Sequence, residues 1–382
     1  MAENRMKGGV IRRGATWSYV VRERDPQTGK TKPRWVGGFR TQAEAKAARA
    51  AAQTAQSRGT YVAPRKMTVG EWLDQWIAGH EIGLKPSTAE SYRSNIERYL
   101  RPRLGHEPLQ GLSPARLTVV FRDLFERGGH NGKPLSPRTV EFARAVLRRA
   151  LADAVLERLI EVNPVVGTKR PKVDKPKHTT WTAEQLRSYL GHDEPRLAPL
   201  FALAAATGMR RGELLALRWA DVDLDGALVS VDRAVAQIGQ ERRYSTPKNH
   251  ERRQVSIDRN SVATLRALRK RQLAERLKWG AAYAGKDDDL LFTWENGAAL
   301  LPDYVSKEFV RTQAGLGLPR LKLHELRHTH ATLLLRAGVP VHVVAKRLGH
   351  KDPSVTLNVY ADAIPDDDGR AVDVFTKAVF GA

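Results

Sequence analysis

The sequence predicts a multidomain chain: a small α+β domain with a three-stranded sheet and a helix, an all-α helical bundle, and a mainly α, mixed α+β domain. The 382 residues exceed what one hydrophobic core usually organises, so two or three domains are expected. The apolar periodicity changes along the chain from strand-like to helical and then to mixed. Two segments rich in Pro, Gly or Lys interrupt it at residues 59–66 and 167–179. We therefore expect domains at residues 1–62, 67–168 and 177–382.

The first domain is expected to combine a small sheet with one helix. Residues 17–24 and 32–39 have strand-like composition and are separated by a turn. The following helix should run to Ser57, because Thr41 and Glu44 have the spacing of a capping box at its start.

Positive charge is concentrated in this first domain. The chain has 64 Lys+Arg against 42 Asp+Glu, a formal net charge of +22, and about half of this surplus lies in residues 1–66. A basic surface can serve solubility alone, but a surplus this large usually indicates a nucleic acid, whose phosphates release counterions when they are neutralised. We expect Arg22, Arg24 and Arg34 on the sheet to contact DNA, mainly its phosphates.

Several classes of protein are excluded by composition. The absence of cysteine rules out disulfides, thiolate zinc sites and cysteine nucleophiles, and it fits a cytoplasmic protein. The first residues contain no apolar stretch, so no secretory signal is expected. The longest apolar run, residues 197–209, contains Pro199 and Gly208 and is too short to span a bilayer. We expect no membrane insertion.

The second domain is expected to be a bundle of about four helices. Apolar residues at helical spacing begin with Trp72. Further helices, each opening on a serine cap, are expected at residues 87–100, 113–126 and 136–159. The linker that follows is rich in lysine and is expected to cross a phosphate backbone. Its cations are Lys169, Arg170, Lys172, Lys175 and Lys177.

The third domain should mix a few strands with many helices. A helix is expected after Trp181, with Thr182 as its cap. Strands are expected at residues 227–236, 242–246 and 253–257, and most of the remainder should be helical.

Three segments of this domain concentrate polar residues: TGMRRGELLALRW, HELRHTHATLLLRAG and LGHKDPSVTLNVY. Their candidate functional residues are Arg210, Glu213, His324, Arg327, His350 and Tyr360. Two arginines suit a phosphodiester, because each guanidinium fork can bind two of its oxygens at once. A tyrosine hydroxyl can attack such a phosphate once its proton is removed.

In this order and spacing, the three segments resemble the boxes of the tyrosine recombinase (phage integrase) family. The resemblance is strong over residues 177–382, and the two preceding domains match the family's arm-binding and core-binding domains in order and size. It implies that Arg210 and Arg327 clamp the scissile phosphate, that Glu213 supports Arg210, and that Tyr360 is the nucleophile.

The resemblance also implies roles for a lysine and two histidines. Lys248, between two expected strands, would protonate the departing 5′ oxygen. His350 would hold the phosphate, and His324, one helical turn from Arg327, would accept or help transfer the tyrosine proton. Which histidine acts as the base stays open. No metal, ATP or other cofactor is expected, because the phosphotyrosyl bond stores the energy of the broken diester.

The implied activity is site-specific recombination that integrates and excises a mobile element through a 3′-phosphotyrosyl intermediate. The implied assembly is a homo-tetramer on double-stranded core and arm attachment sites, in the cytoplasm of a bacterial host and associated with its nucleoid. The sequence does not decide whether a directionality factor or a host DNA-bending protein takes part. In the family a C-terminal segment such as residues 371–380 docks on a neighbouring protomer, and packing on its own domain is the alternative.

Parts of the sequence are also compatible with other functions. The residues HELRH at 324–328 spell the H-E-x-x-H signature of zinc metalloproteases, with His330, His342 or His350 as a third ligand. That hypothesis leaves Arg210, Tyr360 and the charge unexplained. A DNA-binding regulator without catalysis and a type IB topoisomerase are the further alternatives.

Overall fold

The structure is a computed structural model that describes residues 9–24, 30–172, 179–192, 196–246, 252–285, 289–361 and 368–381. The chain divides into two compact units, Met1–Asp174 and Lys175–Ala382. The first unit contains two separate hydrophobic cores, one beneath a small sheet and one inside a helical bundle. The second unit contains one large core and a small cluster around Tyr360.

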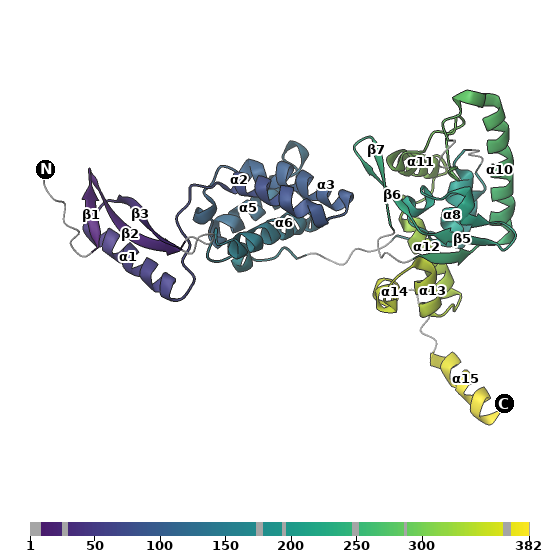
Figure 1. The fold of residues 1–382 in the computed structure, drawn as a ribbon. Coiled ribbons are helices and arrows are strands. Elements are labelled where there is room, and N and C mark those ends of the chain that lie inside the picture. The colour runs from purple at the N-terminus through teal and green to yellow at the C-terminus, as the bar shows by residue number, and fades with distance from the viewer. Residues whose placement is uncertain are drawn as a thin grey trace. The chain divides into compact units, whose positions relative to one another are not determined.

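The small sheet of the first unit is antiparallel, in the order β1-β2-β3, and helix α1 packs on it (Figure 1). These elements are β1 (Val10–Arg13), β2 (Thr16–Arg24), β3 (Thr31–Phe39) and α1 (Gln42–Ser57). Tyr19 and Val21 of β2 are buried with Ala45 of α1. The predicted capping box is confirmed, because Thr41 accepts the Glu44 N–H at 3.2 Å while the Glu44 carboxylate accepts the Thr41 N–H.

The second part of this unit is the helical bundle. Its helices are α2 (Val69–His80), α3 (Pro86–Asn95), the π turn Ile96–Leu100, α4 (Arg101–Leu104), α5 (Pro114–Arg127) and α6 (Pro137–Leu156). Ser113 and Ser136 cap α5 and α6 as predicted. The predicted cap at Ser87 is wrong: α3 begins at Pro86, and Lys85 stands at its N-cap without a side-chain hydrogen bond. Proline is favoured at the first helical position because its missing N–H would have no partner there.

The second unit surrounds α8 with helices and small sheets. Its helices are α7 (Ala183–Leu190), α8 (Ala198–Thr207), α9 (Arg211–Leu214), α10 (Arg259–Trp279), α11 (Pro302–Gly315), α12 (Glu325–Arg336), α13 (Val341–Leu348), α14 (Pro353–Tyr360) and α15 (Asp368–Phe380). Helix α8 is apolar on all sides and packs against α10 and α12, which explains why its segment reads as an uninterrupted apolar run (Figure 1). Gly208, which ends α8, accepts a hydrogen bond from Arg327 of α12 and lies beside Leu348 of α13, so the elements that carry the three polar segments meet there.

The strands of this unit form two sheets. One has the order β4-β5-β8, and the other pairs β6 with β7. Their bounds are β4 (Val222–Asp223), β5 (Leu228–Val231), β6 (Ala234–Ile238), β7 (Glu241–Ser245) and β8 (Arg253–Ser256). The single strand predicted at residues 227–236 is therefore wrong. The chain changes sheet after Val231, and Arg233 turns away to donate to the Ala216 carbonyl at 2.8 Å.

No helix in the described ranges is both long and apolar enough to cross a membrane.

Candidate active site

The first arginine is positioned by the end of α8. Gly208 ends this helix with a φ of 64°, and a Cβ there would lie 2.7 Å from Leu348 and 2.8 Å from the His330 ring. Only glycine combines this left-handed conformation with so close an approach to neighbouring helices. The chain then extends through Arg210 into α9.

Arg210 is held by Glu213 at two points. The Arg210 backbone N–H donates to Glu213 Oε2 at 3.0 Å, and its Nη1 donates to Oε1 at 2.9 Å. The Glu213 side chain is only 1% exposed, whereas that of Arg210 is 23% exposed. The predicted support of Arg210 by Glu213 is thus present in the geometry, with the guanidinium at the surface of the site.

A second arginine, Arg253 at the start of β8, also binds Glu213. Its Nη2 donates to Glu213 Oε2 at 2.6 Å and its Nη1 to Oε1 at 3.2 Å. Its Nε donates to the Arg347 carbonyl at 3.3 Å, near the end of α13. Burial alone would raise the pKa of Glu213, but the hydrogen bonds and charge of Arg253, with those of Arg210, hold it below its usual value.

Arg327 is almost fully buried, at 3% exposure, and joins two segments of the site. Its Nη1 donates to the Gly208 carbonyl at 2.9 Å, and its Nη2 to the Leu348 carbonyl at 2.7 Å. Nη2 also lies 2.8 Å from His350 Nε2. Burial and the charge of Arg210 lower the pKa of Arg327 to about 9, so it remains a cation at neutral pH.

The contacts of His350 define its protonation state. A guanidinium can only donate, so His350 Nε2 accepts from Arg327. The proton of the neutral ring then lies on Nδ1, which donates to Thr356 Oγ1 at 2.7 Å. Burial and the charge of Arg327 lower the pKa of His350 to about 4. His350 is therefore neutral at physiological pH and oriented by Thr356.

Tyr360 lies beside these groups, at the end of α14. It is 4% exposed and packs with Ala331 and Leu348 of α12 and α13. Burial raises the pKa of Tyr360 to about 12, against the opposing effect of the Arg327 charge. Its hydroxyl lies 2.6 Å from His328 Nδ1. The predicted nucleophile is thus next to the buried arginine, and the histidine in contact with it is His328.

His324 occupies a different position. It stands at the N-cap of α12, is exposed, and its ring centroid lies 5.4 Å from that of His328. Together with Arg210 and Lys322 it lines a hollow of about 460 Å³. The structure therefore places His324 on the side of the site where Arg210 is exposed.

The remaining histidine of this helix, His330, is structural. Arg347 Nε donates to its Nε2 at 3.0 Å, and its Nδ1 donates to the Ala205 carbonyl at 2.8 Å. Burial and the charge of Arg347 lower the pKa of His330 to about 4. Both nitrogens are thus engaged, and within the described part of the chain no three His, Cys, Asp or Glu side chains converge to hold a metal ion. His328 contacts the Tyr360 hydroxyl at 2.6 Å, and His324 lines the hollow beside Arg210.

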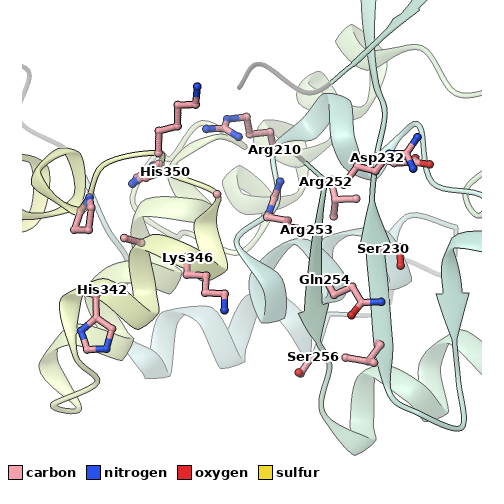
Figure 2. Close-up of a pocket in the computed structure, with 16 residues that line it drawn as sticks. Arg210, Ser230, Asp232, Arg252, Arg253, Gln254, Ser256, His342, Lys346 and His350 are labelled. Carbon is pink, nitrogen blue, oxygen red and sulfur yellow. The ribbon is translucent and has the colours of Figure 1, made fainter. Parts of the chain in front are cut away.

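An open cleft of about 1010 Å³ leads away from these residues, between β5, β8 and α13 (Figure 2). Arg210 and His350 lie at one end of it, and Ser256 and His342 lie toward the other (Figure 2). Its lining cations are Arg210, Arg252, Arg253, Lys346 and Lys351. A groove with this charge suits a polyanionic strand.

Some predicted site residues lie outside the described residues, namely Lys248, Lys175 and Lys177. The strands on either side of Lys248, β7 and β8, belong to different sheets and so do not form one hairpin.

The sheet arginines of the first unit do not share one face. Arg22 pairs with Pro33, on the same face as Val20 and Trp35, whereas Arg34 pairs with Val21, on the face covered by α1. Arg34 Nη2 also hydrogen-bonds to the Pro64 carbonyl. Arg24 ends β2, and its side chain lies outside the described residues. The open face instead carries Arg13, which stacks on Trp35 at 4.0 Å.

Three cations of the second linker are described, and all are exposed: Lys169, Arg170 and Lys172. Arg170 lies 3.5 Å from Glu141 in a surface ion pair. The preceding residue, Thr168, is tied to the bundle because it accepts from the buried Arg144 at 3.0 Å. The beginning of the linker is therefore held against the bundle, and the cations that follow it are exposed.

Two residues that contact the site groups were not predicted from the sequence. His328 follows Arg327 directly, so its position beside a predicted site arginine could have indicated it from the sequence. Arg253 had no local signal, because it reaches Glu213 from 40 positions away. Only the pairing of β8 with β5 places it there.

Three family models match the chain, in the same order as its three parts. Residues 11–55 match the arm DNA-binding domain, residues 68–122 the N-terminal SAM-like domain of phage integrases, and residues 180–366 the phage integrase family.

Relatives and solved structures agree with these matches. A XerC-like tyrosine recombinase of Caldanaerobacter subterraneus is 28% identical over 80% of this chain and 82% of its own length. The ICEBs1 integrase of Bacillus subtilis is 23% identical over 81% and 83%, respectively. The Tn1549 transposon integrase in complex with circular intermediate DNA has a TM-score of 0.66 at 20% identity, over 81% of this chain and 99% of that chain. A lambda integrase tetramer bound to a Holliday junction has a TM-score of 0.62 at 20% identity, over 96% and 99%.

The chain belongs to the phage integrase family of tyrosine recombinases. It is accordingly a site-specific recombinase, an enzyme that transfers DNA strands. The predicted membership of this family and the predicted fold class are confirmed.

Proposed function

We propose that Tyr360 attacks a DNA phosphodiester bound by Arg210, Arg327 and His350, and that this chemistry integrates and excises a mobile element. The observation that carries the proposal is the position of the Tyr360 hydroxyl, 2.6 Å from His328 and close enough to Arg327 for that charge to act on its pKa. A buried tyrosine with no catalytic task would not need a histidine nitrogen at its hydroxyl and a buried arginine whose charge lowers its pKa.

The step is an in-line displacement at phosphorus. A bond forms between Tyr360 Oη and the phosphorus, the bond from phosphorus to the 5′ oxygen breaks, and the tyrosine proton passes to a base. The departing 5′ oxygen takes a proton, for which Lys248 is the proposed donor. Attack of a 5′-hydroxyl from another strand on the 3′-phosphotyrosyl bond reverses the step and regenerates the tyrosine. The diester's energy is conserved throughout.

The fixed charges of the site would stabilise the transition state better than water does. Arg327 is fixed by two carbonyls and His350, so its charge needs no rearrangement when negative charge develops on the phosphate. Arg210, oriented by Glu213, would contact the same phosphate from the solvent side. A phosphate oxygen can only accept, so His350 would hold it through Nε2 once that nitrogen carries a proton, in exchange for the hydrogen bond that Nε2 accepts from Arg327.

We further propose that the three parts of the chain divide DNA recognition. Residues 1–62 would grip arm sites, and residues 67–168 with 177–382 would close around a core site, with Lys169, Arg170 and Lys172 on the backbone between them. The face that carries Arg13, Arg22 and Trp35 would meet the arm site.

Four copies would assemble on two sites, as the lambda integrase does on a Holliday junction. Val372, Phe375 and Val379 of α15 are more than half exposed, which supports docking of this helix on a second copy. The proposed setting is the bacterial cytoplasm, at the nucleoid, where a directionality factor or a DNA-bending protein would join the complex.

Covalent trapping tests the function. The full chain is incubated in EDTA with a nicked duplex that spans one end of the mobile element carrying its gene, and protein–DNA adducts are resolved in SDS. We expect an adduct with the wild type and none with Tyr360→Phe, since the variant lacks only the attacking oxygen. An adduct that survives in Tyr360→Phe would overturn the assignment of the nucleophile.

The same experiment separates the alternatives. If wild type and Tyr360→Phe both bind the duplex, as seen by gel shift, and neither forms an adduct, the chain is a DNA-binding regulator without catalysis. If adducts form only when zinc is added back, the metal-independent mechanism is wrong.

A further inference from the structure

We propose that His328, and not His324, is the residue that accepts the proton of Tyr360. The inference rests on the proposed function, because it names the base of the same displacement. The resemblance to the family leaves the choice between His324 and His350 open, whereas the geometry points to His328 on α12.

Tyr360 is buried, and its hydroxyl contacts His328 directly. Tyr360 Oη lies 2.6 Å from His328 Nδ1, and the two ring centroids are 5.5 Å apart. A base must lie within hydrogen-bond reach of the proton that it removes, at about 2.6–3.2 Å between heavy atoms. In the tautomer with the proton on Nε2, His328 Nδ1 accepts from the Tyr360 hydroxyl, which is the arrangement needed before transfer.

The other histidines near the site are engaged elsewhere. His350 accepts from Arg327 through Nε2 and donates to Thr356 through Nδ1, so taking a proton would break its bond to Arg327. His330 is held in the same way by Arg347 and the Ala205 carbonyl. His324 is exposed and lines a hollow with Arg210, on the phosphate side of the site.

The buried Tyr360 hydroxyl requires a base to remove its proton. Burial holds the proton of Tyr360 more tightly than in water, with a pKa of about 12. Arg327, next to His328 on α12, offsets part of this by stabilising the phenolate. Transfer to His328 places the proton on Nδ1, the Oη–P bond forms, and the P–O5′ bond breaks.

Three variants of the full chain test the inference on the nicked duplex, with adduct formation followed in single turnover. His328→Asn keeps an amide oxygen near the position of Nδ1, so it preserves an acceptor for the hydroxyl but cannot take up a proton. His328→Ala removes both the hydrogen-bond acceptor and the proton-accepting group. His324→Asn is the matched control. We expect both His328 variants to lose about 100-fold or more in rate, the usual contribution of a general base.

The decisive readout is rescue by a more acidic nucleophile. Tyr360 is replaced by 3,5-difluorotyrosine, whose phenol ionises without strong base assistance. In the His328→Asn and His328→Ala variants, this replacement should raise the rate of adduct formation by at least about 10-fold. In the His324→Asn variant it should not. A structural role for His328 predicts instead that Asn rescues the rate and that fluorination does not.

The outcomes are separable from those of the proposed function. If the wild type forms no adduct, the proposed function fails before the histidine is tested. If the wild type forms the adduct and His328→Asn reacts at the wild-type rate, or if fluorination rescues only the His324 variant, the assignment of His328 is overturned while Tyr360 stands.

Discussion

The Arg253 guanidinium binds both oxygens of the Glu213 carboxylate, at 2.6 and 3.2 Å, and this carboxylate also holds Arg210. Glu213 is therefore a buried anion shared by two arginines. Because Arg253 also binds the Arg347 carbonyl, it links α9 to the end of α13, where His350 follows. A Cβ on Gly349 would lie 3.0 Å from Arg253 Cδ, so this turn closes directly onto the arginine.

Removing Arg253 should destabilise the second unit. In Arg253→Met the Glu213 carboxylate stays buried with one partner fewer, which typically costs about 3–5 kcal/mol. Thermal unfolding of the full chain measures this, with Arg243→Met as the control, because Arg243 forms an exposed pair with Glu241 worth at most about 1 kcal/mol. Equal melting of the two variants would show that Arg253 does not stabilise the buried carboxylate.

Thr356 should matter to the rate through His350. Thr356→Val keeps the shape of a fully buried side chain but leaves the His350 Nδ1–H without its acceptor, so the ring loses the bond that orients it. We expect adduct formation to slow by roughly 10-fold, equivalent to about 1.4 kcal/mol. Thr356→Ser, which retains the hydroxyl, serves as the control and should react at close to the wild-type rate.

Stability should fall on the acid side of neutrality because of His330. Its pKa is about 4 in the folded chain and about 6.5 when unfolded, so between these values the unfolded chain binds more protons. The free energy of unfolding therefore decreases as pH falls from about 6.5 to about 4, by on the order of 3 kcal/mol for this group.

The variant that checks this is His330→Gln, whose amide can donate to Ala205 and accept from Arg347 without titrating. Its urea midpoint, followed from pH 7 to 4, should fall less steeply than that of the wild type. Part of the slope should remain, because His350 titrates in the same window. An unchanged slope would contradict the assignment of His330 as a buried neutral histidine.

Replacing a cation of the linker should reduce the salt dependence of DNA binding. Lys169→Gln and Lys172→Gln should each reduce the slope of log K against log[salt] by about 0.9, if each lysine neutralises one phosphate. Binding is measured by fluorescence anisotropy on the same duplex between low and moderate salt. Lys307→Gln on α11 provides a control substitution outside the linker, and an equal effect there would argue against specific backbone contacts by the linker.

Features that depend on neighbours in sequence could be predicted well. The caps at Thr41, Ser113 and Thr182 follow from short-range side-chain bonds, and they are present. Arg210 and Glu213 are three residues apart, so their ion pair is also local. The single strand predicted at residues 227–236 failed because one apolar run serves two sheets, and only pairing partners far along the chain reveal the break.

The sequence by itself determined the family, and it singled out the arginines and the tyrosine to which the phosphate chemistry is proposed, because their types and spacings lie within short segments. Only the tertiary structure decided which histidine contacts Tyr360 and which group completes the partners of Glu213. These relationships depend on how α14 packs against α12 and how β8 lies beside α9 and α13. Such packing is set by the whole hydrophobic core, and no local pattern encodes it.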